Sequence, residues 1–175
     1  MRCSTRKLQS YNFENYRKIA LGVNYLHANN IIHSHLSSKN ILISDAMEPM
    51  ITDYGFLNLK KLANVFLKYK NKNAYSSPEI LKEPRDITNS NNYSDWSIDT
   101  YSFGILLWEI YTGTTPFNVN ISTLYNLVVE NDFRPEIKDT FHLGIAHIIQ
   151  LCWDSCREKR PNFSQILDLL EKITF

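Results

Sequence analysis

The chain has 175 residues, of which 43% are hydrophobic and 13% aromatic, and its 19 basic and 18 acidic side chains give a formal net charge of +1. This length is enough to bury a core, as one domain or part of one. The balanced charge and many aromatic residues exclude a disordered composition and the net basic field that drives nucleic-acid binding.

The expected location is the cytoplasm. Three cysteines form an odd and sparse set, which indicates a reducing compartment rather than a disulfide framework. The first residues include basic side chains, but the apolar run of a secretory signal does not follow them. The longest apolar stretch, residues 103–110, contains Glu109 and is too short to span a bilayer. We therefore expect no nucleic-acid or membrane partner.

The first predicted elements are a helix and a hairpin. Apolar residues recur at helical spacing over residues 13–27, which predicts a helix with one buried face. Two short β-forming runs follow at residues 41–43 and 50–52, and the turn residues between them predict a hairpin.

The second half of the sequence predicts a helical body. Residues 99–112 are apolar on nearly every side and precede Gly113, as expected of a central helix that ends at a glycine. Further helices are predicted at about residues 121–131, 140–153 and 162–173, the last one after Pro161. The predicted fold class is mainly α, with one short β-hairpin.

Two other segments have open interpretations. Five lysines and no acidic residue lie between Asp53 and Glu79, where the spacing predicts an amphipathic helix at about residues 58–69. That helix presents either an ordinary solvated lysine face or an anion- or partner-binding patch. Residues 117–134 form either a core stripe or a docking surface, and residues 82–94 are expected to form a surface loop.

Five motifs occur in a fixed order. The sequence reads H-S-H-L-S-S-K-N from His33, D-Y-G from Asp53 and S-P-E from Ser77; D-T-Y-S-F-G-I-L-L-W-E and C-W-x(6)-R-P-x-F follow. These resemble the protein-kinase set H-R-D-L-x-x-x-N, D-F-G and A-P-E, and the last two are similar to the tyrosine-kinase-like group. The resemblance implies a kinase C-terminal lobe over residues 13–175 after an extension at residues 1–12.

The resemblance covers one lobe of a bilobal fold. In the family, a smaller N-terminal lobe supplies a Gly-rich loop over the ATP phosphates and a strand lysine that contacts them. Neither G-x-G-x-x-G nor V-A-I-K precedes the first predicted helix. We therefore expect the nucleotide-clamping lobe to be absent from this chain.

The predicted catalytic loop departs from the family pattern. His33 is kept, but Ser34 stands where the family has Arg, His35 where it has the catalytic Asp, and Ser37 where it usually has Lys. The aspartate accepts the proton of the substrate hydroxyl, and the lysine stabilises the transferring phosphoryl group. Histidine can accept a proton near neutral pH but has a different shape. The resemblance thus implies a degenerate kinase that is not an enzyme.

Asn40 and Asp53 match the residues that hold Mg²⁺ in the family. They imply at most a weak residual Mg²⁺ or ATP site, and otherwise we expect no cofactor. The alternative is structural: Asn40 caps loop backbone, and Asp53 accepts backbone hydrogen bonds in its turn. The spacing of the histidines and cysteines does not suggest a zinc site.

Three residues with structural roles in the family are intact. Glu79 and Arg160 match the ion pair that ties the activation segment to the helices behind it, and Asp99 matches the helix aspartate that binds catalytic-loop backbone. The fold-keeping residues are present where the chemical ones are changed, which indicates a pseudokinase kept as a binding surface.

Within the group, the chain resembles the mixed lineage kinase domain-like pseudokinases, including those encoded by poxviruses. The likeness rests on the S-x-N end of the loop, the Y-S-F-G-I-x-L-W-E-I helix and the T-G-x-x-P-F that follows. It implies a decoy that sequesters a host receptor-interacting kinase and blocks necroptosis. The alternatives are the C-terminal half of a kinase or pseudokinase, or a regulatory lobe for another kinase or scaffold.

Overall fold

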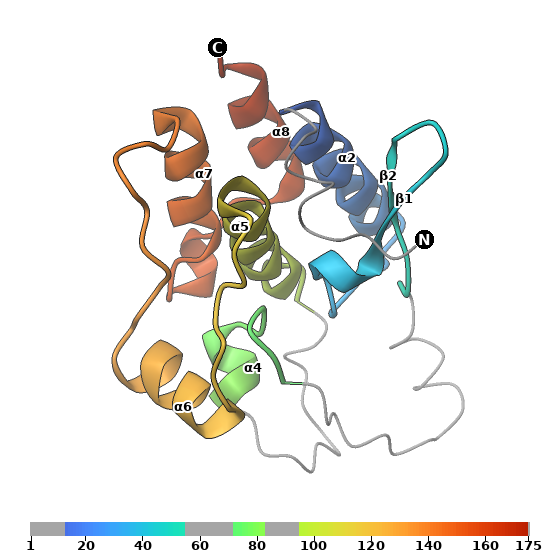
Figure 1. Cartoon of the computed structure of the whole chain (residues 1–175). Helices are drawn as coiled ribbons and strands as arrows, with labels where there is room; N and C mark the ends of the chain where they lie inside the picture. Colours follow the sequence, from blue (N-terminus) through green and yellow to red (C-terminus); the bar gives the residue numbers. More distant parts are fainter. Residues whose placement is uncertain (1–12, 55–71, 83–94, 175) are drawn as a thin grey trace, which may run out of the picture.

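The computed structural model describes residues 13–54, 72–82 and 95–174. Its elements are α2 (Glu14–Ala28), a 3₁₀ turn (Ser38–Asn40), β1 (Ile41–Ile43), β2 (Pro49–Ile51), α4 (Pro78–Lys82), α5 (Ser97–Thr112), α6 (Ile121–Tyr125), a π-helical turn (Asn126–Glu130), α7 (Leu143–Cys152), a 3₁₀ turn (Arg157–Lys159) and α8 (Phe163–Glu171). The predicted mainly-α fold with one hairpin is confirmed (Figure 1). The predicted extension at residues 1–12, the helix at residues 58–69 and nearly all of the loop at residues 82–94 lie outside the described residues.

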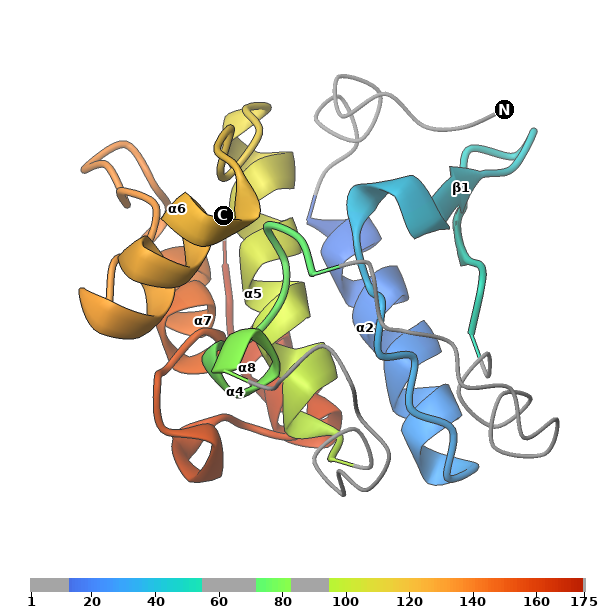
Figure 2. The same cartoon turned by 90° about the horizontal axis from the view of Figure 1, so that it is seen from below.

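Helix α5 is the centre of the molecule. In Figures 1 and 2 it runs between α2 on one side and α7 on the other, and its residues Ser97–Ile110 are all buried. An element that is covered on all sides needs apolar residues all round, as this helix has. The helix ends where the sequence predicts, because Gly113 adopts a left-handed conformation with φ 68°. It begins two residues early, at Ser97, whose amide donates to Asp95 Oδ1 at 2.9 Å.

Gly104 allows α5 and α7 to approach closely. A Cβ at this position would lie 2.8 Å from Cys152 Cβ and 3.3 Å from the Ile149 carbonyl oxygen. We expect Gly104→Ala to lower the free energy of unfolding by about 1–3 kcal/mol, because backbone of α7 would have to move. Thermal unfolding measures the loss.

Gly144→Ala is the matched control. Its added Cβ would meet side-chain atoms of Ile173, the nearest being Cγ1 at 2.8 Å, and a side chain can turn aside more easily than a backbone can move. A loss at Gly104 no larger than the loss at Gly144 would contradict the close helix contact.

Helix α2 and the hairpin form the other side of the core. The buried face of α2 includes Ile19, Ala20 and Val23, and the helix lies between α8 and the hairpin (Figure 1). The hairpin is antiparallel with Ile41 opposite Ile51, so the second strand begins one residue earlier than predicted. The hairpin thereby sets the positions of the loop before it and of Asp53 after it.

The ends of several elements differ from the predictions. Helix α7 begins at Leu143 instead of residue 140, because the His142 side chain accepts the Gly144 amide hydrogen at the helix start. It ends at Cys152, so Cys156 does not share a helix with it. The short helix α4 was not predicted, although Pro78 is a favourable first residue. None of the helices in residues 13–54, 72–82 and 95–174 is long and apolar enough to cross a membrane.

Candidate catalytic loop

The start of the loop between α2 and β1 is hydrogen-bonded to Asp99 of α5. This carboxylate has 0% exposure, and it accepts the His33 amide hydrogen at 2.8 Å and the Ser34 amide hydrogen at 2.7 Å. Its Oδ2 atom also lies 2.8 Å from His27 Nε2 at the end of α2. The first turn of α5 therefore fixes the start of the loop, as the family resemblance implies. The contact of His27 with Asp99 was not predicted.

The residues His33, Ser34 and His35 are also bonded to one another. Ser34 has φ 65°, and its hydroxyl donates to the His33 carbonyl oxygen at 2.6 Å. Ser34 Oγ lies 3.0 Å from His35 Nδ1, and the His35 amide donates to His33 Nδ1 at 3.3 Å. His33 itself is fully buried and contacts the Thr52 carbonyl oxygen through Nε2 at 2.9 Å. The imidazole of His33 thus joins the loop to the residue before Asp53.

Asn40 and Asp53 have different surroundings. The Asn40 side-chain nitrogen donates to the His35 carbonyl oxygen at 2.8 Å, so it caps loop backbone as the structural alternative requires. Its Oδ1 is the side-chain atom that could bind a cation. Asp53 is exposed, and its backbone adopts a left-handed conformation with φ 61°. Within the described part of the chain, no three His, Cys, Asp or Glu side chains form a cluster that could hold a metal ion.

A buried acid, Glu109 of α5, lies on the other side of the loop. It is 5% exposed and accepts hydrogen bonds from Ser38 Oγ at 3.2 Å and from the Tyr75 hydroxyl, while Ser38 Oγ and Tyr75 OH are 3.0 Å apart. Burial raises the pKa of Glu109 above its usual value, against the opposing effect of these two donors. This network was not predicted, although one acid within the apolar run of residues 103–110 is a sequence signal for it.

We expect Tyr75→Phe to raise the pKa of Glu109 further, because the carboxylate loses a donor that stabilises its charged form. A carboxyl group whose pKa is raised by folding stabilises the fold below its unfolded pKa, and this contribution is lost as pH rises through the folded pKa. The variant should therefore lose more stability at pH 7 than at pH 4. An NMR titration of the Glu109 side-chain carbonyl measures the shift, with the 70% exposed Tyr25 changed to Phe as the control. A pKa that stays constant or falls would show that Tyr75 does not stabilise the charge.

Glu79 and Arg160 form a bidentate ion pair. Arg160 Nη1 lies 2.6 Å from Glu79 Oε1, and Nη2 lies 3.0 Å from Oε2. The Arg160 side chain is 0% exposed, and it also donates to the Asp154 and Ser97 carbonyl oxygens at 2.8 and 3.1 Å. Burial alone would raise the pKa of Glu79, but the hydrogen bonds and charge of Arg160 hold it below its usual value. The pair therefore ties α4 to the start of α5 and to the segment before α8.

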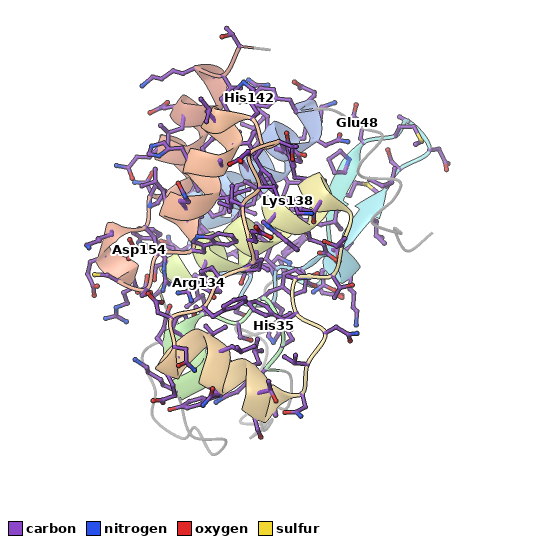
Figure 3. All side chains as sticks on the ribbon, turned by 60° about the vertical axis from the view of Figure 1, so that its left-hand side comes forward. His35, Glu48, Arg134, Lys138, His142 and Asp154 are labelled. Atoms are coloured by element: carbon purple, nitrogen blue, oxygen red, sulfur yellow. The ribbon has the colours of Figure 1, made fainter. Side chains whose placement is uncertain are left out.

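His35 borders a small cavity of about 20 Å³ between the loop and the segment that leads into α4. Figure 3 shows His35 between α5 and α4. The loop contributes Ser34 and His35, while Lys72 and Ser76 approach from the opposite wall. Ser37 is buried beside the loop and supplies no charge. The side chain at the aspartate position is therefore half-buried beside this cavity.

Comparison with known proteins agrees with this geometry. Residues 2–170 match the family model of protein tyrosine and serine/threonine kinases. The chain is 34% identical over 93% of its length to a probable serine/threonine-protein kinase of Dictyostelium discoideum, and 32% identical over 88% to the serine/threonine/tyrosine-protein kinase HT1 of Arabidopsis thaliana. It is 33% identical over 88% to the dual specificity protein kinase shkD of Dictyostelium discoideum. The chain spans 17%, 38% and 20% of these three relatives.

These relatives overturn the prediction that the chain is not an enzyme. Proteins named as kinases match it at 27–34% identity, which favours a kinase over a pseudokinase. That prediction rested on the changes at Ser34, His35 and Ser37 and on the missing Gly-rich loop and strand lysine. The backbone of the loop keeps its bonds to Asp99 and Asn40, and an imidazole at residue 35 can accept a proton near neutral pH. The chain belongs to the protein tyrosine and serine/threonine kinase family.

Proposed function

We propose that the chain is the acceptor-side lobe of a protein kinase, which transfers a phosphoryl group from ATP to a hydroxyl group on a protein. The observation that supports this best is the position of His35. It occupies the aspartate position of a loop whose backbone is held by Asp99 and Asn40, and it borders a small cavity between the loop and the segment that leads into α4. This is the alternative in which the chain is the C-terminal half of a kinase.

In the proposed reaction, His35 accepts the proton of the acceptor hydroxyl as the hydroxyl oxygen bonds to the terminal phosphorus of ATP and the bond to ADP breaks. Asn40 and Asp53 would hold Mg²⁺, which neutralises phosphate charge. Their oxygens suit this ion, because Mg²⁺ usually binds one or two carboxylates together with substrate phosphates. Asp99 keeps the loop in place through its bonds to His33 and Ser34.

Incubation of the full-length protein that contains this chain with radiolabelled ATP, Mg²⁺ and a general acceptor protein tests the proposal. We expect labelled acceptor, and we expect Asp53→Ala to abolish the labelling. Asp45→Ala is the matched control, because Asp45 is an exposed acid in the hairpin turn. Labelling no greater than in a reaction without the kinase would overturn the proposal.

A second proposal concerns the partner. The resemblance to the mixed lineage kinase domain-like proteins supports a receptor-interacting kinase of a host cell as the binding partner, with interference in necroptosis as the consequence. The proposal includes a cytoplasmic location and a viral source. The intact Glu79–Arg160 pair, which would keep the shape of the lobe, is compatible with such a role. A pull-down of receptor-interacting kinases that recovers none of them would overturn it.

A further inference from the structure

The directions of the hydrogen bonds around Ser34 follow from simple chemistry. Its hydroxyl has one proton and contacts two atoms, the His33 carbonyl oxygen at 2.6 Å and His35 Nδ1 at 3.0 Å. A carbonyl oxygen has no proton to donate, so the hydroxyl proton belongs to the shorter contact. Ser34 Oγ must then accept in the other contact, and His35 Nδ1 must carry a hydrogen.

The neighbouring histidine is fixed in the opposite form. His33 Nε2 lies 2.9 Å from the Thr52 carbonyl oxygen and must donate to it. His33 Nδ1 accepts the His35 amide hydrogen at 3.3 Å, so this atom carries a lone pair. Two histidines separated by one residue therefore hold their protons on different ring nitrogens.

The backbone around these rings is fixed. Asp99 accepts the amide hydrogens of His33 and Ser34, and Asn40 donates to the His35 carbonyl oxygen. Ser34 is also left-handed at φ 65°, which directs its side chain differently from an extended residue. The position of Ser34 Oγ, the atom that accepts from His35, is consequently determined by the loop backbone. It does not depend on free rotation of a surface side chain.

We propose that Ser34 is a positioning residue that holds the neutral His35 ring with its hydrogen on Nδ1 and its lone pair on Nε2. The catalytic meaning of this assignment rests on the proposed function, in which Nε2 is then the atom that accepts the hydroxyl proton. Ser34 and His35 act as a unit that stands where the family has Arg and Asp. The tautomer itself can be measured without any catalytic activity.

Nitrogen-15 NMR of the histidine-labelled chain tests the assignment, at a pH of about 8 where an ordinary imidazole is neutral. We expect the ring nitrogen shifts and their couplings to ring protons to show Nδ1–H for His35 and Nε2–H for His33. Ser34→Ala should remove the Nδ1–H pattern of His35 and leave His33 unchanged. Ser76→Ala is the matched control, since Ser76 lines the same cavity and its hydroxyl accepts from the Asn73 amide.

The variant Ser34→Gly distinguishes the effect of the lost hydroxyl from the effect of the left-handed backbone at this position. Glycine removes the hydroxyl and adopts φ 65° without cost, so it should change the His35 signals in the same way as alanine. An Nε2–H signal for His35 in the unaltered chain, or an Nδ1–H signal that survives both substitutions, would overturn the inference. The expected tautomer in a protein that transfers no phosphate would uphold the inference and overturn the proposed function alone.

Discussion

Arg160→Ala is expected to lower the free energy of unfolding by about 3–5 kcal/mol, the usual cost of removing one partner from a buried ion pair. The change would leave the Glu79 carboxylate without its counter-charge and the Asp154 and Ser97 carbonyl oxygens without a donor. The Arg160 guanidinium also lies 5.1 Å from the centre of the Tyr101 ring, so that contact is lost too. Urea unfolding followed by circular dichroism measures the change.

The control is an exposed ion pair, Lys18–Glu48, with a similar distance between its nitrogen and oxygen atoms. Lys18 Nζ lies 2.6 Å from Glu48 Oε2, and the two side chains are 32% and 48% exposed. Lys18→Ala should cost less than about 1 kcal/mol, because water screens the charges. Similar losses for both variants would contradict the structural importance of the Arg160 pair.

The same pair should give the lobe a defined response to acid. Because the pKa of Glu79 is lowered by folding, its contribution is present above the unfolded pKa of about 4.3 and is lost as pH falls through the folded pKa. The difference in stability between the unaltered chain and Arg160→Ala should therefore shrink below about pH 4. A difference that stays constant down to pH 2 would show that the Glu79 charge does not contribute to it.

Asp99→Ala is expected to release the catalytic loop. The change leaves the amides of His33 and Ser34 without their acceptor, and each unsatisfied buried donor costs about 1–3 kcal/mol. Hydrogen exchange at these two amides should accelerate far more than at the amides of α7. Urea unfolding measures the accompanying loss of stability.

Asp95→Ala is the control for a general effect at the start of α5. The Asp95 carboxylate accepts the Ser97 amide hydrogen at 2.9 Å and lies 3.5 Å from Arg157 Nη1. A helix-end contact of this kind contributes about 1 kcal/mol, and an exposed ion pair contributes less than that. Equal exchange rates at His33 and Ser34 in the unaltered and Asp99→Ala proteins would contradict the role of Asp99 in holding the loop.

The sequence predicted the positions of the helices better than the contacts between side chains. Hydrophobic spacing reports which face of a segment is buried, and for this reason α2, α5 and α8 were placed within a few residues. The five-residue helix α4 is too short to show a period. The first residue of α7 depended on the His142 side chain, which spacing does not reveal.

The candidate site shows the same limit. Kinase motifs located His35 and Asp99 in the sequence, but the contact of His27 with Asp99 joins residues 72 positions apart. The contacts of Glu109 with Tyr75 and Ser38 join residues 34 and 71 positions apart. These contacts depend on packing between elements distant in sequence. The prediction about catalysis relied on the changed loop residues and on the missing nucleotide lobe, and the relatives named as kinases contradict it.

The rate of phosphoryl transfer by the full-length protein with His35→Ala tests the central claim most directly. A positioned general base contributes about 10²–10⁴-fold to a rate, so we expect the variant to be at least about 100-fold slower, with the same circular dichroism spectrum. His35→Asp should restore part of the lost rate, because a carboxylate can also accept the proton. Equal rates for the unaltered and His35→Ala proteins would contradict the assignment of His35 as the base.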